Sequence, residues 1–220
     1  FSSFPVFHTD AVQAVNSLDL NVEKLGVDLL SLSGAKIDEI SKVGVLYKKK
    51  TVTLSNVYGG GDQENGLRPG TENWTGIVSF AKSLKLTQDL KIKENSRLLK
   101  LRNYFINKLL KLDSIILING DLENRLSNNV NVSFGKIPSD LLVIELSAKG
   151  IMVSAKSACQ STTKKGSYVI EAIRPDADHQ IGGVRFSFGK ETTKSDIDYT
   201  LKVLFNILTK LKKWYTPTPI

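Results

Sequence analysis

The chain contains little sulfur and no long apolar segment. Its single cysteine, Cys159, has no second thiol to pair with among the 220 residues, which excludes an internal disulfide. The longest apolar runs, 115–118 and 141–144, are far too short to cross a bilayer, and the first residues show no charged start followed by an apolar stretch, as a signal peptide would. These absences argue against a disulfide-stabilised or membrane-inserted chain, and we expect a cytoplasmic protein.

Positive charge exceeds negative charge, since 30 Lys and Arg against 22 Asp and Glu give a formal net charge of +8. Lysines cluster at 48–50, 164–165 and 210–213. These clusters lie on separate segments and lack interleaved aromatic residues, so a solvated lysine-rich surface is favoured over a nucleic-acid interface. The excess charge would help to attract anionic ligands such as phosphates.

The N-terminal part alternates short apolar strands with helical segments. Strands are expected at 6–9, 28–33 and 44–48, and a helix at 11–17. This alternation is typical of an α/β layer with buried strands. A segment rich in glycine that also contains proline, 58–70, follows and is expected to be a loop rather than a core element.

From residue 72 to about residue 112 the pattern is largely helical, with a break expected near 89–95. We place a domain boundary inside this region, near residue 90. In the C-terminal part Ser139 is expected to cap a helix ending at Ala148, and Thr193 with Asp196 resembles a capping box. One apolar stripe is predicted along the helix that follows, formed by Ile197, Leu201, Leu204, Leu208 and Leu211. The remaining strands are expected at 114–117, 129–134, 151–154 and 184–188.

Cys159 lies in a stretch of small residues, Ser157-Ala158-Cys159, and is followed by Gln-Ser-Thr-Thr-Lys-Lys-Gly. Two interpretations are open at this point. A free cysteine commonly packs as a small buried hydrophobe. A thiol in a polar loop with lysines nearby is instead placed to react as a stabilised thiolate.

Three segments carry polar residues that neither core packing nor turn geometry requires: 8–13, 31–36 and 68–71. In an α/β sheet the loops at the carboxyl ends of strands share one crevice, so Asp10 and Lys36 can face each other there. A pyridoxal phosphate site needs a lysine for the Schiff base, a carboxylate for the pyridine nitrogen and donors around the phosphate. The alternative is a solvated Lys36 and a capping Asp10, which the residues taken singly favour.

Six segments form a set that is far more specific than any one of them. They are His8-Thr-Asp-Ala-Val-Gln-Ala-Val, Val27-Asp-Leu-Leu-Ser-Leu-Ser-Gly-Ala-Lys, Gly59-Gly-Gly-Asp-Gln-Glu-Asn-Gly-Leu-Arg-Pro-Gly-Thr-Glu-Asn, Asn128-Asn-Val-Asn, Ser157-Ala-Cys and Val184-Arg-Phe-Ser-Phe-Gly. Together, over nearly the whole chain, they resemble the cysteine desulfurases of the NifS/IscS type. These enzymes belong to the class V aminotransferases and have the fold-type I architecture.

The resemblance implies an α/β fold with two domains. Residues 1–90 would form the C-terminal part of a large domain that binds pyridoxal phosphate. Residues 91–220 would form a small α+β C-terminal domain carrying the cysteine loop. The family's first part, which supplies the histidine that stacks on the cofactor ring, has no counterpart in the chain, and neither of its histidines is assigned that role.

The resemblance also implies roles in binding the cofactor. Asp10 would pair with the pyridinium nitrogen, and Gln13 would contact the phenolic oxygen. Lys36 would form the Schiff base, and Ser33 would help to bind the phosphate. Thr71 would reach the phosphate of the other subunit's cofactor, because the family's site lies at a homodimer interface.

For the substrate, L-cysteine, the resemblance implies that Arg185 clamps the carboxylate bidentately. Cys159 would be the nucleophile that takes the sulfur, leaving alanine and a persulfide. The nine-residue spacing from Cys159 to Tyr168 matches the family's longer-loop subgroup, whose cysteine carries sulfur to an acceptor or scaffold protein for iron–sulfur cluster assembly or thio-modification. No metal site is predicted.

The chain departs from the family pattern at two places beside Lys36. Ala35 stands where the family has a histidine that binds the phosphate, and 38–42 replaces a segment containing glycines and a proline. Weaker cofactor binding is therefore expected. Two alternatives to a cysteine desulfurase stay open: a non-catalytic relative that serves as a dimerisation or scaffold module, and another class V lyase or aminotransferase that uses pyridoxal phosphate.

Overall fold

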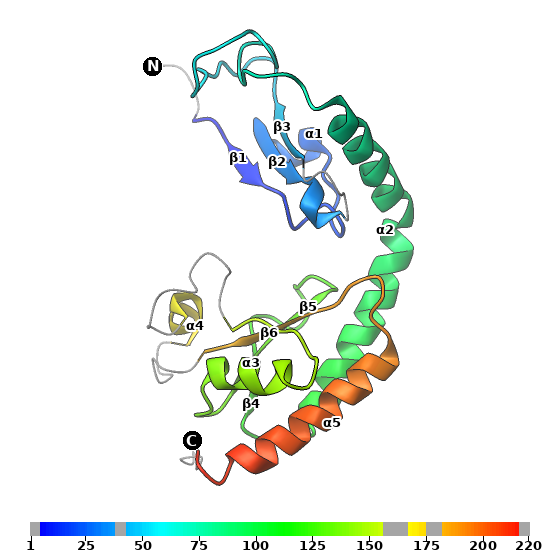
Figure 1. The fold of residues 1–220 in the computed structure, drawn as a ribbon, viewed down its shortest axis with the longest axis vertical. Coiled ribbons are helices and arrows are strands. Elements are labelled where there is room, and N and C mark those ends of the chain that lie inside the picture. The colour runs from blue at the N-terminus through cyan, green and yellow to red at the C-terminus, as the bar shows by residue number, and fades with distance from the viewer. Residues whose placement is uncertain (1–4, 38–42, 156–166, 175–181, 216–220) are drawn as a thin grey trace. The chain divides into compact units, whose positions relative to one another are not determined.

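The computed structural model describes residues 5–37, 43–155, 167–174 and 182–215 (Figure 1). The chain divides into two compact units, residues 1–93 and 94–220, and each is described by itself below. The long helix α2 (Trp74–Leu109) contributes residues to both units. The point of division falls within this helix, close to the boundary expected near residue 90.

The first unit contains a three-stranded sheet in the order β1 (His8–Asp10), β2 (Leu29–Ser33), β3 (Gly44–Lys48). Strand β1 runs parallel to β2, and β3 runs antiparallel to it. The three strands lie close to the ranges expected from the apolar runs. The described part of the unit therefore has the parallel pairing that α/β folds use, with an antiparallel strand at one edge.

Residues 12–17 form successive turns rather than the expected helix. The Asp10 carboxylate accepts a hydrogen bond from the Val12 N–H at 3.0 Å, which closes a local turn directly after β1. The helix that does form, α1 (Val22–Leu25), begins at Asn21, whose side chain accepts from two backbone N–H groups, and ends at Gly26 with a positive φ of 64°. Strong capping and stop signals so close together keep α1 to one turn.

Alternation along β2 separates an apolar face of the first sheet from a polar one. Leu30 is buried and packs with Val27, which precedes β2, and Ala11, which follows β1. A neighbouring cluster joins Val15 and Ile37 to Phe80 of α2. The opposite face is the more polar of the two. It carries His8, Asp10, Ser31 and Ser33 together with the apolar Leu29 of β2 and Leu46 of β3.

Helix α2 is continuous, so the expected break near 89–95 is wrong. No glycine or proline follows Gly76 within the helix, and two polar side chains in its middle bond to the first unit. Gln88 donates to the Val15 carbonyl at 3.0 Å, and Lys91 donates to the Leu18 carbonyl at 3.1 Å. The first unit thus uses these side chains to hold its turn segment against the helix.

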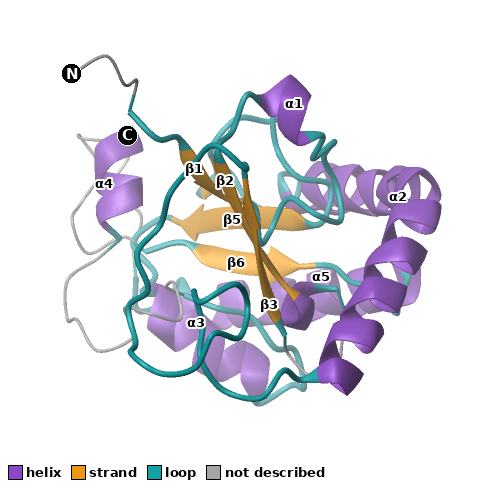
Figure 2. Cartoon of the chain, turned by 90° about the horizontal axis from the view of Figure 1, so that it is seen from above, coloured by secondary structure: helices purple, strands orange, loops and turns teal. Residues whose placement is uncertain are grey.

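The second unit contains an antiparallel sheet in the order β4 (Ile116–Asn119), β5 (Asn129–Phe134), β6 (Val184–Ser187). Helices α3 (Ser139–Ser147) and α5 (Lys194–Leu211), which contact each other, lie on one side of it (Figure 2). This face buries the main core, whose fully enclosed members include Phe105, Leu109, Val130, Val132, Val184, Leu142 and Leu204. The Phe105 ring lies 5.0 Å from that of Phe186, tilted by 54°.

Helix α5 confirms its sequence signals. Thr193 and Asp196 form a reciprocal capping box, and every member of the expected apolar stripe is buried. The helix cap predicted at Ser139 is wrong, because Pro138 precedes the first turn of α3 and Ser139 is buried inside it without a capping bond. No helix among the described residues is long and apolar enough to cross a membrane.

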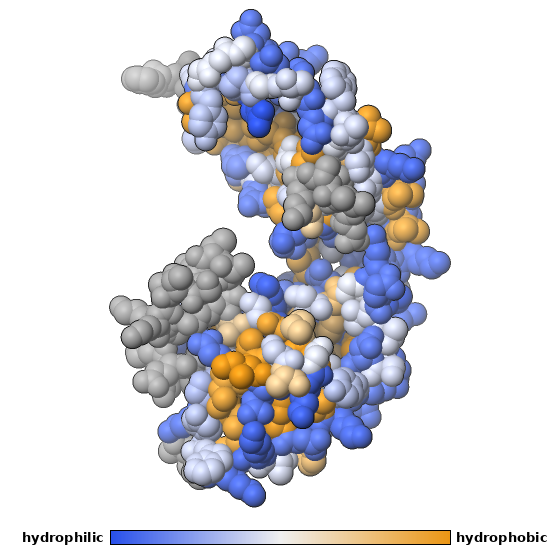
Figure 3. Space-filling view, in the orientation of Figure 1, coloured by the Kyte–Doolittle hydropathy of each residue, from blue (hydrophilic) through white to orange (hydrophobic). Residues whose placement is uncertain are grey.

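The expected strand at 151–154 is wrong in extent, because only Ser154 pairs with a strand. It forms an isolated antiparallel bridge with Arg185 of β6. On the face shown in Figure 3, apolar side chains (orange) gather over the second unit among hydrophilic ones (blue). Several exposed apolar side chains lie in this unit, including Ile144, Met152 and Phe205.

Candidate cofactor and substrate sites

The polar face of the first sheet brings together residues from the ends of β1 and β2. The parallel register pairs Asp10 with Ser31, so both side chains lie on the same face. His8 lies two pairs earlier and so on the same face, and its Nε2 is 2.9 Å from the Ser31 hydroxyl. Because both strands end here, their carboxyl ends form the edge at which ligands bind in α/β sheets.

Lys36 follows at once, as the last residue of a 3-10 helix, Gly34–Lys36 (η1). Its carbonyl accepts a hydrogen bond of 2.7 Å from the Asn16 side chain, and its neighbour Ile37 is buried. The backbone is therefore held on both sides while the Lys36 side chain is exposed. Asp10 is exposed too, so neither the amine nor the carboxylate lies beneath packed apolar side chains.

Ser33 lies on the same face as Ser31 and Asp10, at the last position of β2. Gln13 is exposed in the turn segment that follows β1. Four of the residues expected at the cofactor, Asp10, Gln13, Ser33 and Lys36, thus come from the strand ends and the segments that directly follow them. Their roles stay predictions.

Thr71 lies in the loop that precedes α2 and is exposed. The loop is folded on itself: Gly70 donates its N–H to the Gln63 side chain at 3.2 Å, and a Cβ at Gly60 would lie only 2.6 Å from the Pro69 ring. Within the described part of the chain, no hydrogen bond joins Thr71 to Asp10, Gln13 or Lys36. The contact expected for Thr71 was with another subunit, so it stays a prediction.

The donor set at this edge fits pyridoxal phosphate. A carboxylate, a lysine amine and a serine hydroxyl are the groups that hold the ring nitrogen, the carbonyl carbon and the phosphate of this cofactor. Ala35, which is exposed, adds no donor beside Lys36. Among the described residues no group of three or more His, Cys, Asp or Glu could hold a metal ion.

The second unit presents Arg185 in the middle of β6, with its side chain exposed. Its backbone is fixed on both sides. Arg185 pairs with Asn131 of β5, and it exchanges hydrogen bonds with Ser154, at 2.7 Å for its own N–H and 3.3 Å for the N–H of Ser154. A guanidinium on a strand held in this way is suited to bidentate recognition of a carboxylate.

Cys159 lies outside the described residues, but the segments on either side of it are placed. Before it, Ser154 is held by its bridge to Arg185. After it, α4 (Tyr168–Ile173) begins with a cap by the Ser167 side chain, and Arg174 donates to the Ile118 carbonyl at 2.8 Å. Both flanks of the predicted cysteine loop therefore attach to the sheet that carries Arg185.

Sequence reasoning missed a polar cluster beside Arg185. Asn119 is 5% exposed, and its side-chain amide donates to the Asn131 Oδ1 at 2.8 Å and to the Ser133 hydroxyl at 2.9 Å. The signal was present in Asn129-Val-Asn-Val-Ser-Phe, where polar and apolar residues alternate with the period of a strand. It could not be interpreted before the partner strands were known.

A buried arginine supports the same unit away from Arg185. Arg102 is 3% exposed, and its guanidinium donates to the carbonyls of Arg125 and Leu126 at 3.1 and 3.2 Å. Burial, together with the nearby charge of Arg125, lowers the pKa of Arg102 below its ordinary value. These contacts hold the segment before β5, and we assign them a structural role.

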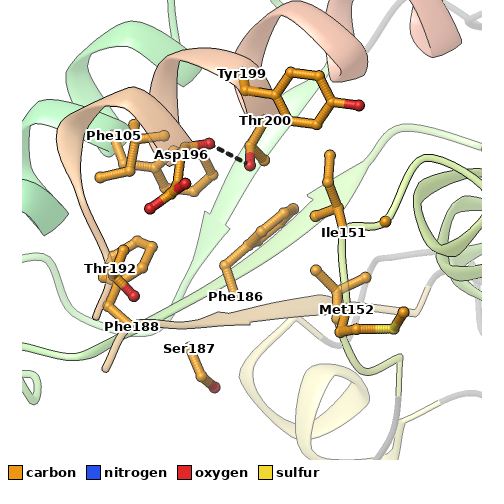
Figure 4. Close-up of a pocket in the computed structure, with 13 residues that line it drawn as sticks. Phe105, Ile151, Met152, Phe186, Ser187, Phe188, Thr192, Asp196, Tyr199 and Thr200 are labelled. Carbon is orange, nitrogen blue, oxygen red and sulfur yellow. Dashed lines mark hydrogen bonds between the residues drawn. The ribbon is translucent and has the colours of Figure 1, made fainter. Parts of the chain in front are cut away.

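An open groove of about 270 Å³ lies between β6, the segment 150–153 and the start of α5 (Figure 4). Its lining combines apolar side chains such as Phe186 and Met152 with polar ones such as Thr192 and Tyr199. Among the described residues that line it, Asp196 is the only carboxylate, and its hydrogen bonds with Thr193 commit it to the helix cap. These lining residues include no paired nucleophile and base.

Comparison with known proteins identifies the family. The model for class-V aminotransferases matches residues 5–200, and the chain belongs to this family. The chain is 42% identical over 206 residues to "Cysteine desulfurase IscS" of Dictyoglomus turgidum, covering 94% of the chain and 52% of that protein. It is 41% identical over 215 residues to the protein of the same name from Methanosarcina thermophila, covering 97% of the chain and 52% of that protein.

Solved structures agree in fold. A "NIFS-LIKE PROTEIN" superposes with a TM-score of 0.83 at 33% identity, over 94% of the chain and 53% of that structure. A NifS-like protein from Rickettsia africae superposes with a TM-score of 0.82 at 24% identity, over 93% of the chain and 54% of that structure, which shows the fold alone. The chain thus spans about half the length of the relatives it matches.

Proposed function

We propose that this chain provides the cofactor lysine and the C-terminal part of a cysteine desulfurase that depends on pyridoxal phosphate. The observation that carries the proposal is the exposure of Asp10 and Lys36 at the shared end of β1 and β2, in a chain similar to cysteine desulfurases over almost its full length. The first unit would be part of the large cofactor domain, and the second unit the small C-terminal domain.

Each residue has a task that follows from its chemistry. Lys36 would hold the cofactor covalently, and Asp10 would keep the ring nitrogen protonated. Ser33 and Gln13 would hold the phosphate and the phenolic oxygen. When bound, pyridoxal phosphate supplies an electron sink for bonds broken at the substrate's carbons. The exposed edge of the sheet leaves room for the cofactor and for further protein around it.

Arg185 would bind the carboxylate of L-cysteine and so orient the substrate's sulfur. The Cys159 thiolate would attack that sulfur, forming an S–S bond while the C–S bond of the substrate breaks. The electron pair of the broken bond stays with carbon and is finally protonated. L-Cysteine and the Cys159 thiol thus become L-alanine and a Cys159 persulfide, with no external oxidant or reductant.

The persulfide sulfur would pass to an acceptor or scaffold protein for iron–sulfur cluster assembly or thio-modification. We further propose a homodimer located in the cytoplasm, in which Thr71 reaches the partner's cofactor. Support for these points comes from the resemblance to the desulfurase family and from the exposed position of Thr71. A non-catalytic scaffold is less favoured, because the residues of the cofactor edge keep chemically suitable side chains.

The first test compares the variants Lys36→Ala and Lys50→Ala. Both are made in the full protein that the gene encodes, and each is incubated with pyridoxal phosphate. Lys50 is also an exposed lysine of the first unit, which makes it a matched control. We expect a yellow absorbance band that borohydride bleaches in the unmodified protein and in Lys50→Ala, and none in Lys36→Ala. A protein that stays colourless with the cofactor would overturn the proposal.

The second test separates a desulfurase from other enzymes with the same cofactor. Cys159→Ser should keep the absorbance band and lose sulfide release from L-cysteine. Sulfide release at the unmodified rate in Cys159→Ser would contradict the assignment of the nucleophile while leaving the cofactor site intact.

A further inference from the structure

Three polar side chains form one row across the second sheet. The antiparallel register pairs Asn119 of β4 with Asn131 of β5, and Asn131 with Arg185 of β6. Residues directly opposite each other in antiparallel strands have their side chains on the same face, with Cβ atoms about 5 Å apart. The row therefore makes Asn131 and Arg185 direct cross-strand neighbours on one face of the sheet.

The amide of Asn131 is held in one orientation from its oxygen side. Its Oδ1 accepts from the Asn119 side chain at 2.8 Å, and Asn119 is itself buried and bonded to Ser133. Gly183 of the preceding segment encloses the same oxygen, because an added Cβ there would overlap it. With the oxygen enclosed, the NH₂ group is the part of the amide that is left to bind a ligand.

The Arg185 guanidinium presents the same kind of group. Its side chain is exposed, and in the part of the chain that the structure describes it has neither a hydrogen-bond acceptor nor an ion-pair partner. Arginine has only donors, as does the outward end of the Asn131 amide. Two neighbouring donor groups, one of them cationic, form a site for an anion with several acceptor positions, and a carboxylate has about four.

We propose that Asn131 is a second binding residue for the substrate carboxylate, donating its amide N–H beside the Arg185 fork. The inference rests on the proposed function, which makes the carboxylate of L-cysteine the ligand of Arg185. A bidentate arginine occupies two of the acceptor positions of a carboxylate, and Asn131 takes another. Asn119 acts through Asn131 as a positioning residue, because it holds the amide oxygen and so directs the NH₂ group outward.

The test compares two variants, Asn131→Leu and Asn131→Asp, with the control Asn129→Leu. All are made in the full protein that the gene encodes and are loaded with pyridoxal phosphate. Asn129 lies on the same strand and face, opposite Ser187 instead of Arg185, so it controls for the loss of an asparagine from β5. We expect the KM for L-cysteine and the Kd for L-alanine to rise about 10- to 100-fold in both Asn131 variants. They should stay unchanged in Asn129→Leu.

Two further readouts separate carboxylate binding from a purely structural role. Cysteamine, which lacks the carboxylate, should bind equally well to the unmodified protein and to Asn131→Leu. The kcat for L-cysteine should stay within about twofold, because a contact made equally in ground and transition states changes KM alone. Asn119→Ala should raise KM in the same direction by less.

The variant Asn131→Asp tests which end of the amide faces the ligand. Because the aspartate side chain has nearly the same shape as asparagine, this variant is also expected to fold. It replaces the donor by a second acceptor, so the KM should rise at least as far as in Asn131→Leu. An unchanged or lower KM in Asn131→Asp, or equal losses with cysteamine and L-cysteine, would overturn the inference. Absence of sulfide release from the unmodified protein would instead contradict the proposed function, and the Kd for L-alanine would still test Asn131.

Discussion

Gly183→Ala should destabilise the second unit, although it adds only one methyl group. A Cβ at this position would lie 2.8 Å from the Ile170 Cδ1 and 3.0 Å from the Asn119 Nδ2, and it would overlap the Asn131 Oδ1. Real Cβ atoms essentially never come within 3.0 Å of another side chain, as this one would at Ile170 and Asn131. Because Gly183 is buried, the neighbouring side chains must move into space that is already filled.

The magnitude follows from what must move. Forcing a methyl group into a packed site costs about 1–3 kcal/mol. Turning the Asn131 amide away also breaks its hydrogen bond with Asn119, which is worth about 1 kcal/mol. We therefore expect a loss of about 2–4 kcal/mol in the free energy of unfolding, or about 5–15 °C in Tm. On the proposed function, the displacement of Asn131 should also raise the KM for L-cysteine.

Gly189→Ala is the matched control, since a Cβ there would meet nothing within 4 Å. Its effect should lie within about 0.5 kcal/mol of zero. Urea denaturation followed by far-ultraviolet circular dichroism measures both variants against the unmodified protein. Equal midpoints for Gly183→Ala and Gly189→Ala would refute the argument, because the close approach around Gly183 would then carry no cost.

Two further predictions concern α5. Leu204→Ala, at a fully buried position, should lower the free energy of unfolding by about 2–5 kcal/mol. Phe205→Ala, on the exposed side of the helix, should change it little. Equal urea midpoints for the two variants would contradict the packing of α5. Hydrogen bonds from the side chain and then the backbone of Thr193 lower the pKa of Asp196, so the stabilisation it provides is complete above the unfolded pKa of about 3.9 and is lost as the pH falls through the lower folded pKa. Asp196→Asn should therefore flatten the acid limb of the stability curve, and an unchanged dependence on pH would argue against the cap.

Features decided by neighbouring residues could be predicted from the sequence. The capping box and the apolar stripe of α5 depend on spacings of three and four residues, and both are present. The alternation in β5 likewise specifies a strand at its observed bounds. The family could be recognised too, because its motifs keep their order along the chain.

Features decided by contacts between residues far apart in the sequence could not be predicted in this way. The break expected near 89–95 is absent from α2, where Gln88 and Lys91 donate to carbonyls 73 residues away in the sequence. The helix expected at 11–17 is replaced by successive turns, and one of these carbonyls, that of Val15, belongs to them. The local pattern of neither segment contains the position of the other.

By itself the sequence determined the chemistry available to this protein: a lysine, a carboxylate, an arginine and a single thiol, set in motifs that resemble one enzyme family. Only the tertiary structure decided which of these groups are neighbours. Strand register brought Asn119 and Asn131 into line with Arg185, and the parallel pairing of β1 with β2 set Asp10 beside Ser31. Register is a relation between strands that lie far apart in the chain, so a shift by one residue would turn the same side chains to the opposite face.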